Sequence, residues 1–172
     1  MLLSLCTMKI FGLTGNAGSG KDTFFRAVKK NLPSAMRVAF ADELKREIAN
    51  LTGFTVEYIE QHKADFRGLL QHWGTNLRRN HCGADYWLKK MSAIPVPKDS
   101  FVFVTDVRFQ NEADWIRERG GKIIRIIRTG HKNTDQHISE TGVESISPDQ
   151  IITAKDAAEL EAIAASFVES IK

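Results

Sequence analysis

The chain has 172 residues, of which 42% are hydrophobic and 26% are charged, and its formal net charge at pH 7 is +3. This length fits one domain, 1–172, or one domain with an inserted lid, and it allows folding without disulfides. The composition is that of an ordinary globular protein, and the small net charge argues against a nucleic-acid partner.

The two cysteines, Cys6 and Cys82, lack metal-binding spacing, which favours a reduced, cytoplasmic compartment. The apolar segment 1–7 is too short for a signal peptide or a membrane span. We therefore expect no membrane partner.

The first expected strand, 8–14, leads into a glycine-rich loop and then a helix over 20–32. A strand, a G-x-x-x-x-G-K loop and a helix in this order are typical of a phosphate-binding site. Glycines let backbone N–H groups turn toward an anion, the helix N-terminus favours negative charge, and Lys21 adds a mobile cation. The predicted phosphate-binding residues are Gly15, Asn16, Ala17, Gly18, Ser19, Gly20, Lys21, Asp22 and Thr23.

Asp22 stands where such loops usually have Ser or Thr, and Thr23 comes one position later. The usual hydroxyl contacts Mg²⁺. A carboxylate could hold the metal through water, although it also brings negative charge close to the phosphates. Asp22 is therefore a candidate metal ligand through water, and a chance glycine-rich turn is the alternative for the whole loop.

A second short strand is expected over 37–41, and the chain after it is mainly helical. Asp42 follows this strand, where it either caps the next helix or contacts a bound sugar or base. The helices expected here cover 42–51, 55–61, 66–79 and 84–92.

The helix over 66–79 has an apolar stripe and a second, polar stripe. The apolar residues are Phe66, Leu69, Leu70, Trp73 and Leu77. Arg67, Gln71, Gly74 and Arg78 lie at i, i+4, i+7 and i+11, within an arc of roughly 60° in a regular helix. Glycine costs about 1 kcal/mol here relative to alanine, which indicates close approach of a ligand or close helix packing. Arginine forks suit a phosphate, so this stripe predicts a second anion site; a solvated basic face is the alternative.

A continuous apolar strand is expected over 100–105, followed by a helix over 111–119. Asp106 ends this strand, as does the acidic residue beyond the metal in nucleotide-binding sites, and Arg108 follows. We expect Asp106 to support a metal through water; capping of the next helix or pairing with Arg108 is the alternative.

Arg128 ends the next strand, 122–128, at the mouth of a polar segment, 129–148, which we expect to form a lid. A cation there could offset the charge of a transferring phosphoryl group, and an arginine in solvent is the alternative. His137, Ser139 and Glu140 lie in this segment, but their spacing does not define a catalytic triad. His62, His72, His81 and His131 form no recognisable zinc set.

A short strand, 150–153, and a helix over 156–171 complete the alternation. Asp156 and Glu159 have capping-box spacing, and the expected buried stripe is Ala157, Leu160, Ile163, Phe167 and Ile171. Strands that alternate with helices predict an α/β fold: a doubly wound parallel sheet of about five strands with helices on both faces. Ligands bind such sheets at the carboxyl ends of the strands, so the expected ligand loops follow the first strand, Phe40 and Thr105.

Several blocks beyond the loop resemble those of bacteriophage-type deoxynucleoside monophosphate kinases, and the likeness extends over most of the chain. They are Gly15 to Thr23, Phe40-Ala41-Asp42 with Leu44-Lys45, Arg67 with Leu69-Leu70-Gln71 and Gly74-Thr75, Asp85-Tyr86-Trp87, Asp106-Val107-Arg108-Phe109 with Asn111-Glu112, and His137 with Ser139-Glu140. One departure is Thr153-Ala154-Lys155, where relatives tend to have Asn near the strand end.

The resemblance implies a P-loop kinase fold with a helical acceptor-binding insertion, about 42–99, and a lid, about 129–148. It implies ATP-dependent phosphorylation of a deoxynucleoside monophosphate, with Mg²⁺. Homodimers are known in the family, although no residue here indicates one. It also implies that Arg67 holds the acceptor phosphate and that Arg128 acts near the lid. Together with the residue patterns above, this leads us to predict Lys21, Asp22 and Arg128 as catalytic residues. The predicted substrate-binding residues are Asp42, Lys45, Arg67, Gln71, Arg78, Asp106 and Arg108.

Two other functions remain open from the sequence. Dephospho-coenzyme A and phosphomevalonate kinases have related loops and arginine-rich acceptor sites. A non-catalytic ATP-binding regulatory module would retain the glycine loop but would have no need of a second anion site.

Overall fold

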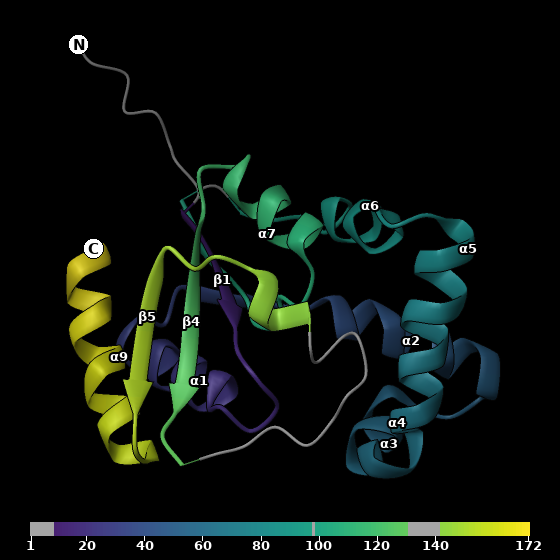
Figure 1. Ribbon diagram of the computed structural model, residues 1–172, viewed down its shortest axis with the longest axis horizontal. Helices are drawn as coiled ribbons and strands as arrows, with labels where there is room; N and C mark the ends of the chain where they lie inside the picture. The colour runs from purple at the N-terminus through teal and green to yellow at the C-terminus, as the bar shows by residue number, and fades with distance from the viewer. Residues whose placement is uncertain (1–8, 98, 131–141) are drawn as a thin grey trace. The chain divides into compact units, whose positions relative to one another are not determined.

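The computed structural model describes residues 9–97, 99–130 and 142–172 (Figure 1). The chain divides into two compact units. The first, here called the sheet unit, comprises 1–38 and 96–172, and the second, here called the helical unit, is Ala39–Pro95. In the described part of the chain, no helix is both long and apolar enough to cross a bilayer.

The sheet unit contains a five-stranded sheet in the order β2-β3-β1-β4-β5, and every neighbouring pair is parallel. The strands are β1 (Lys9–Thr14), β2 (Ala35–Val38), β3 (Phe101–Val104), β4 (Lys122–Arg128) and β5 (Gln150–Ala154). Their continuous apolar runs suit a sheet that is covered on both faces. The predicted α/β fold with a doubly wound parallel sheet is confirmed.

Helices α1 (Lys21–Asn31) and α9 (Ala157–Ile171) share one core with the sheet. Phe24 and Leu160 pack there with Ile126 of β4. Helix α7 (Gln110–Arg117) covers the opposite face, because Ile123 and Ile116 both lie beside Gly12 of β1. Alternate residues of a strand point to opposite faces, so Ile123 and Ile126 support different layers.

Helix α9 begins as the sequence predicts, because the Asp156 side chain accepts a hydrogen bond from the Glu159 N–H at 2.9 Å. The Glu159 carboxylate, however, accepts from the Lys155 N–H rather than from Asp156. The buried stripe also differs in part from the expected one. Leu160 and Phe167 are buried as expected, whereas Ala157 is exposed and Ala164 and Val168 are buried instead.

The helical unit consists of short helices, and their boundaries correct two expectations. The elements are α2 (Phe40–Thr52), α3 (Val56–Gln61), α4 (Lys63–Gln71), the π-helix η1 (His72–Arg79), α5 (Asn80–Cys82) and α6 (Tyr86–Ser92). The strand expected over 37–41 ends at Val38, and α2 begins at Phe40. Asp42 therefore does not end a strand. It lies in the first turn of a helix, where its negative charge interacts favourably with the helix dipole.

The helix expected over 66–79 is α-helical only as far as Gln71. From His72 the backbone adopts a π-helix, whose wider turn places residues i and i+5 on one face. The predicted alignment of Arg67 and Gln71 with Gly74 and Arg78 assumed a regular α-helix and is wrong beyond Gln71. Gly74 packs against α2: a Cβ atom there would lie 3.0 Å from Leu44 Cδ2, so its smallness serves close helix packing.

Candidate functional site

The glycine loop between β1 and α1 has the backbone conformation that its glycines allow. Gly15, Gly18 and Gly20 have φ angles of 139°, 75° and 101°. Lys21 turns back over the loop, and its Nζ donates to the Gly15 carbonyl at 2.5 Å and to the Asn16 carbonyl at 2.9 Å. The loop thus forms a turn that ends at a helix N-terminus, an arrangement suited to phosphate.

Gly15 is the position where a side chain would disturb this loop most. A Cβ atom there would lie 2.4 Å from the Ile126 carbonyl oxygen, which belongs to the backbone of β4. We expect Gly15→Ala to lower the free energy of unfolding by roughly 3 kcal/mol or more, and to weaken binding at the predicted phosphate site. Urea unfolding and calorimetric titration with ATP would measure these effects.

Gly120→Ala is the matched control for this prediction. Gly120 also has a positive φ, 73°, but a Cβ atom at this position would have nothing within 4 Å. The control should cost only the left-handed backbone penalty of about 1–2 kcal/mol. Equal costs for the two variants would contradict the assignment of a tight contact at Gly15.

Three sequence-predicted features lie near the carboxyl ends of adjacent strands. Strand β1 pairs with β3 on one side and β4 on the other, so the glycine loop, Asp106 and Arg128 leave the sheet at the same edge. Asp106 is half-buried, and Arg128 is exposed at the end of β4. This edge is where parallel sheets bind ligands, as the sequence analysis expects.

Arg128 also borders two cavities of the sheet unit. The larger, of about 380 Å³, is lined by Gly15, Asn16, Ser19, Arg125, Ile126, Ile127, Arg128, Val143 and Glu144. The smaller, of about 70 Å³, is lined by Ser19, Gly20, Thr23, Arg128, Ala154, Asp156, Ala157 and Leu160. Both combine loop residues with Arg128, so the structure brings this arginine close to the predicted phosphate site.

The segment after Asp106 is held by Glu112, which the sequence analysis did not select as a site residue. The Glu112 carboxylate accepts from the N–H groups of Arg108 and Phe109, at 2.8 and 3.1 Å. Glu112 is only 2% exposed. A glutamate at the third position of a helix often caps the preceding backbone, so the spacing from Phe109 to Glu112 was the available signal.

The sheet unit contains both expected metal ligands, Asp22 and Asp106. Among the described residues, no three His, Cys, Asp or Glu side chains gather into a metal site. Asp22 is exposed in the first turn of α1, and Asp106 follows β3. One or two carboxylates with water and phosphate oxygens are the donors that Mg²⁺ prefers, so these residues fit a metal that binds with a nucleotide.

Part of the expected lid is packed against the sheet, and the rest lies outside the described residues. The Arg125 guanidinium donates to the Val143 carbonyl at 2.9 Å and to the Ile146 carbonyl. Val143 and Ile146 are both buried. Residues 131–141, with His131, His137, Ser139 and Glu140, are outside the description, so their expected roles stay predictions.

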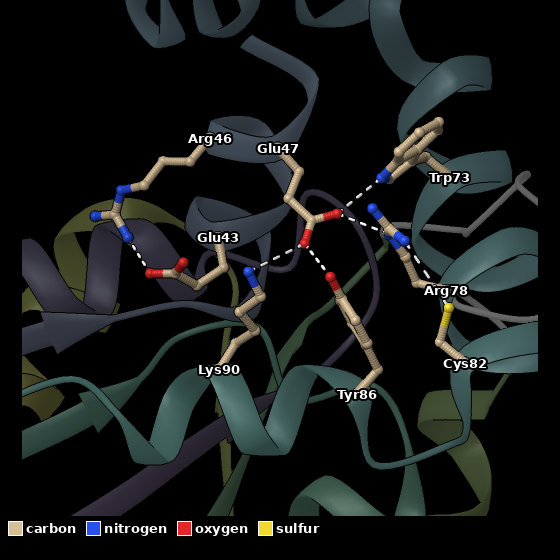
Figure 2. Close-up of polar contacts among 8 residues, drawn as sticks. All are labelled: Glu43, Arg46, Glu47, Trp73, Arg78, Cys82, Tyr86 and Lys90. Atoms are coloured by element: carbon tan, nitrogen blue, oxygen red, sulfur yellow. Dashed lines mark hydrogen bonds and ion pairs between the residues drawn. The ribbon is translucent and has the colours of Figure 1, made fainter. Parts of the chain in front are cut away.

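In the helical unit, Arg78 belongs to a cluster centred on the carboxylate of Glu47 (Figure 2). Arg78 Nε donates to Glu47 Oε2 at 2.8 Å, and Trp73 Nε1 donates to the same oxygen at 2.9 Å. The other oxygen accepts from the Tyr86 hydroxyl and lies 3.3 Å from Lys90 Nζ. Sequence reasoning missed Glu47, because the cluster draws its members from three separate helices.

The surroundings of Glu47 keep its carboxyl ionised. Burial alone would raise the pKa of Glu47, but hydrogen bonds from Trp73, Tyr86, Arg78 and Lys90 together lower it below the ordinary value of 4.5. The sign follows from linkage: this contribution to stability is present above pH 4.5 and is lost as the pH falls through the depressed pKa. The cluster therefore keeps its charge pattern at neutral pH.

Burial, and next the hydrogen bond to Glu47, raise the pKa of Tyr86 from 10.0 to about 12. The neutral phenol is favoured in the folded state, so its contribution to stability is present below pH 10 and is lost as the pH rises toward 12. We expect the tyrosinate absorbance of a Tyr58→Phe protein to report this high pKa, and Glu47→Gln to lower it part of the way. An unchanged pKa in the Glu47→Gln protein would contradict the contact.

Lys45 is engaged with carboxylates of the helical unit. Its Nζ lies 2.5 Å from Glu60 Oε2 and 3.7 Å from Asp42 Oδ1, and its side chain is 9% exposed. The hydrogen bond from Lys45 is the main cause that lowers the pKa of Glu60, and burial opposes it. Asp42 and Lys45 are thus brought together on α2. Arg67 and Gln71 lie one turn apart on α4, where Arg67 is exposed and Gln71 is half-buried.

Comparison with known proteins identifies related chains. Residues 53–164 match the model of the deoxynucleotide monophosphate kinase family. A protein of Acanthamoeba polyphaga mimivirus, provisionally named deoxynucleotide monophosphate kinase, is 31% identical over 169 residues, covering 84% of this chain and 87% of its own.

Two phage proteins named deoxynucleotide monophosphate kinase match a shorter part of the chain. The protein of Enterobacteria phage T4 is 33% identical over 91 residues, and that of Escherichia phage RB69 is 35% identical over 92 residues. Each alignment covers 51% of this chain, but only 38% and 37% of the phage proteins. The present chain therefore aligns with well under half of the length of either phage relative.

Among solved structures, shikimate kinase from Aquifex aeolicus shares the fold. The TM-score is 0.50 at 17% identity, and the match covers 95% of this chain and 98% of the other. At this identity the likeness supports the fold alone.

Proposed function

The chain belongs to the deoxynucleotide monophosphate kinase family, and on that basis we propose that it transfers the γ-phosphoryl group of ATP to a deoxynucleoside monophosphate. The products are the deoxynucleoside diphosphate and ADP. The observation that carries the proposal is the glycine loop at the carboxyl end of β1, with Lys21 folded over it.

The donor polyphosphate is assigned to the loop from Gly15 to Thr23. Its backbone N–H groups and the N-terminus of α1 favour a bound anion, and the position of Gly15 leaves room for the main chain alone. Lys21 can exchange its loop carbonyls for phosphate oxygens, since its flexible side chain ends in a point charge. When bound, Mg²⁺ would neutralise phosphate charge, and Asp22 and Asp106 would hold it through water.

The acceptor phosphate is assigned to Arg67 and Gln71 of α4. Arg78 of η1 is out of regular alignment with them, but it is assigned to the same phosphate because its guanidinium is oriented by Glu47 and is partly exposed. A guanidinium can bind a phosphate with two parallel hydrogen bonds, which positions the acceptor as well as attracting it. Asp42 is proposed to contact the sugar or base of the acceptor, and Lys45, Asp106 and Arg108 are proposed as further substrate-binding residues.

Catalysis by this set of residues would consist of positioning and charge stabilisation. Phosphoryl transfer needs the attacking and leaving oxygens in line, with positive charge around the transferred group. Lys21 supplies that charge from the loop, and Arg128 supplies it from the end of β4. The proposed contact of Arg128 with the transferred phosphoryl group is supported by its position: Arg128 lines both cavities together with residues of the glycine loop.

A coupled assay of ADP release with ATP, Mg²⁺ and each deoxynucleoside monophosphate tests the proposal. Turnover that depends on at least one of these acceptors is the expected result. Turnover with only dephospho-coenzyme A or phosphomevalonate would change the acceptor class. Tight ATP binding without ADP release from any acceptor would reject the enzyme and favour a regulatory module.

A further inference from the structure

Glu47 binds more donors than a simple ion pair would require. Its carboxylate accepts hydrogen bonds from Trp73, Arg78 and Tyr86 and forms an ion pair with Lys90, and its side chain is 13% exposed (Figure 2). These partners come from η1 and α6, whereas Glu47 comes from α2. One carboxylate thus joins three helices of the helical unit.

The π-helix explains why Arg78 faces this carboxylate. Trp73 and Arg78 are five residues apart, and a π-helix places residues at that spacing on the same face. Both side chains therefore reach the same oxygen, Glu47 Oε2. In a regular α-helix the two Cβ directions would lie about 140° apart. Short π-helical segments occur frequently at functional sites.

The cluster holds the guanidinium of Arg78 in one orientation. Its Nε donates to Glu47, its Nη1 lies 3.8 Å from Cys82 Sγ, and its carbon lies 4.9 Å from the Trp73 ring and 5.1 Å from the Tyr86 ring. The side chain is nevertheless 30% exposed. An arginine that is already oriented loses less conformational freedom when it binds a phosphate.

The charge of the cluster also favours an anion. Arg78 and Lys90 both contact Glu47, so within the cluster two cations share one carboxylate. Trp73 and Tyr86 are neutral, and Tyr86 is used as a donor. The cluster therefore carries a surplus positive charge next to a partly exposed guanidinium.

We propose that Glu47 is a positioning residue for the acceptor site, which fixes Arg78 so that its terminal N–H groups face the acceptor phosphate. This inference rests on the proposed function. Glu47 acts through Arg78 and does not touch the substrate.

The test compares steady-state kinetics of Glu47→Gln and Glu43→Gln in the full chain. Glutamine replaces one Glu47 oxygen by an NH₂ group and leaves Arg78 without its charged partner. We expect the acceptor KM to rise about tenfold, a change in the range of coupling between contacting residues, while the ATP KM stays within twofold. Glu43 lies one turn before Glu47 on α2 and pairs with Arg46 instead of Arg78. Glu43→Gln should therefore leave both KM values unchanged.

A double-mutant cycle separates positioning from general stability. In an Arg78→Ala background, Glu47→Gln should have no further effect on the acceptor KM, because the residue through which it acts is gone. A further tenfold rise in that background would overturn the proposal, as would an unchanged KM for Glu47→Gln alone. If Glu47→Gln does not fold, Arg78→Lys, which keeps the charge but lacks Nε, replaces it; an unchanged acceptor KM for Arg78→Lys would also overturn the proposal.

The wild-type protein distinguishes this failure from failure of the proposed function. If it turns over no acceptor, the proposed function is rejected, and calorimetric binding of deoxynucleoside monophosphates replaces kinetics. Affinity that falls about tenfold in Glu47→Gln would still support positioning. If no monophosphate binds to the wild-type protein, both proposals are rejected.

Discussion

Lys21→Ala is expected to lower kcat by about 10²- to 10³-fold. The ammonium is the only side-chain cation within the loop motif, and its charge counts most when the phosphoryl group is in transfer. Because Lys21 also donates to the Gly15 and Asn16 carbonyls, its loss should loosen the loop. These contacts lie outside the hydrophobic core, so we expect the variant to fold. Single-turnover measurements with saturating ATP would report the chemical step directly.

Lys30→Ala is the control for this prediction. Lys30 is exposed in the last turn of the same helix, so its removal changes the net charge equally without touching the loop. We expect its kcat to stay within about twofold of the wild-type value. Circular dichroism should show the same folded spectrum for both variants. An equal loss of kcat in the two would mean that Lys21 acts through net charge alone.

Arg67→Ala should raise the KM for the acceptor while leaving the KM for ATP almost unchanged. A hydrogen-bonded charge pair contributes about 1.5–3 kcal/mol, so we expect a rise of roughly 10- to 150-fold. Arg67 is exposed on α4, and its removal should leave the unfolding free energy within about 0.5 kcal/mol. Initial rates measured over a grid of both substrate concentrations would give the two KM values.

Arg46→Ala provides the matched control, since Arg46 is an exposed arginine of the same helical unit that pairs with Glu43. It should leave both KM values unchanged. If Arg67→Ala weakened both substrates equally, the division into a donor site at the glycine loop and an acceptor site on α4 would be wrong.

The sequence was most informative where residues close together in the chain determine the structure. The strand, the glycine loop and the helix that follow one another around Lys21 need only short-range signals, so their positions were predicted to within two residues. The same holds for β4, whose apolar run matches its strand residue for residue. Alternation of such runs with helices sufficed for the parallel sheet.

The helical unit was less predictable, because its backbone departs from a standard period. Periodicity arguments place residues with a fixed angle per residue, and η1 changes that angle at His72. Arg78 was therefore assigned to a stripe with Arg67, although it faces Glu47. Similarly, no residue near Lys45 in the sequence indicates that Glu60 of the next helix is its partner.

The amino-acid sequence by itself determined the sheet, the phosphate loop and the kinase family, because each depends on residues that are adjacent or regularly spaced. Only the tertiary structure decided which charged and polar side chains contact one another. Glu47 meets donors from η1 and α6, far along the chain, and only the packing of these helices with α2 brings them within hydrogen-bond distance. Electrostatic energy depends on distances in space, and those distances are set by the fold.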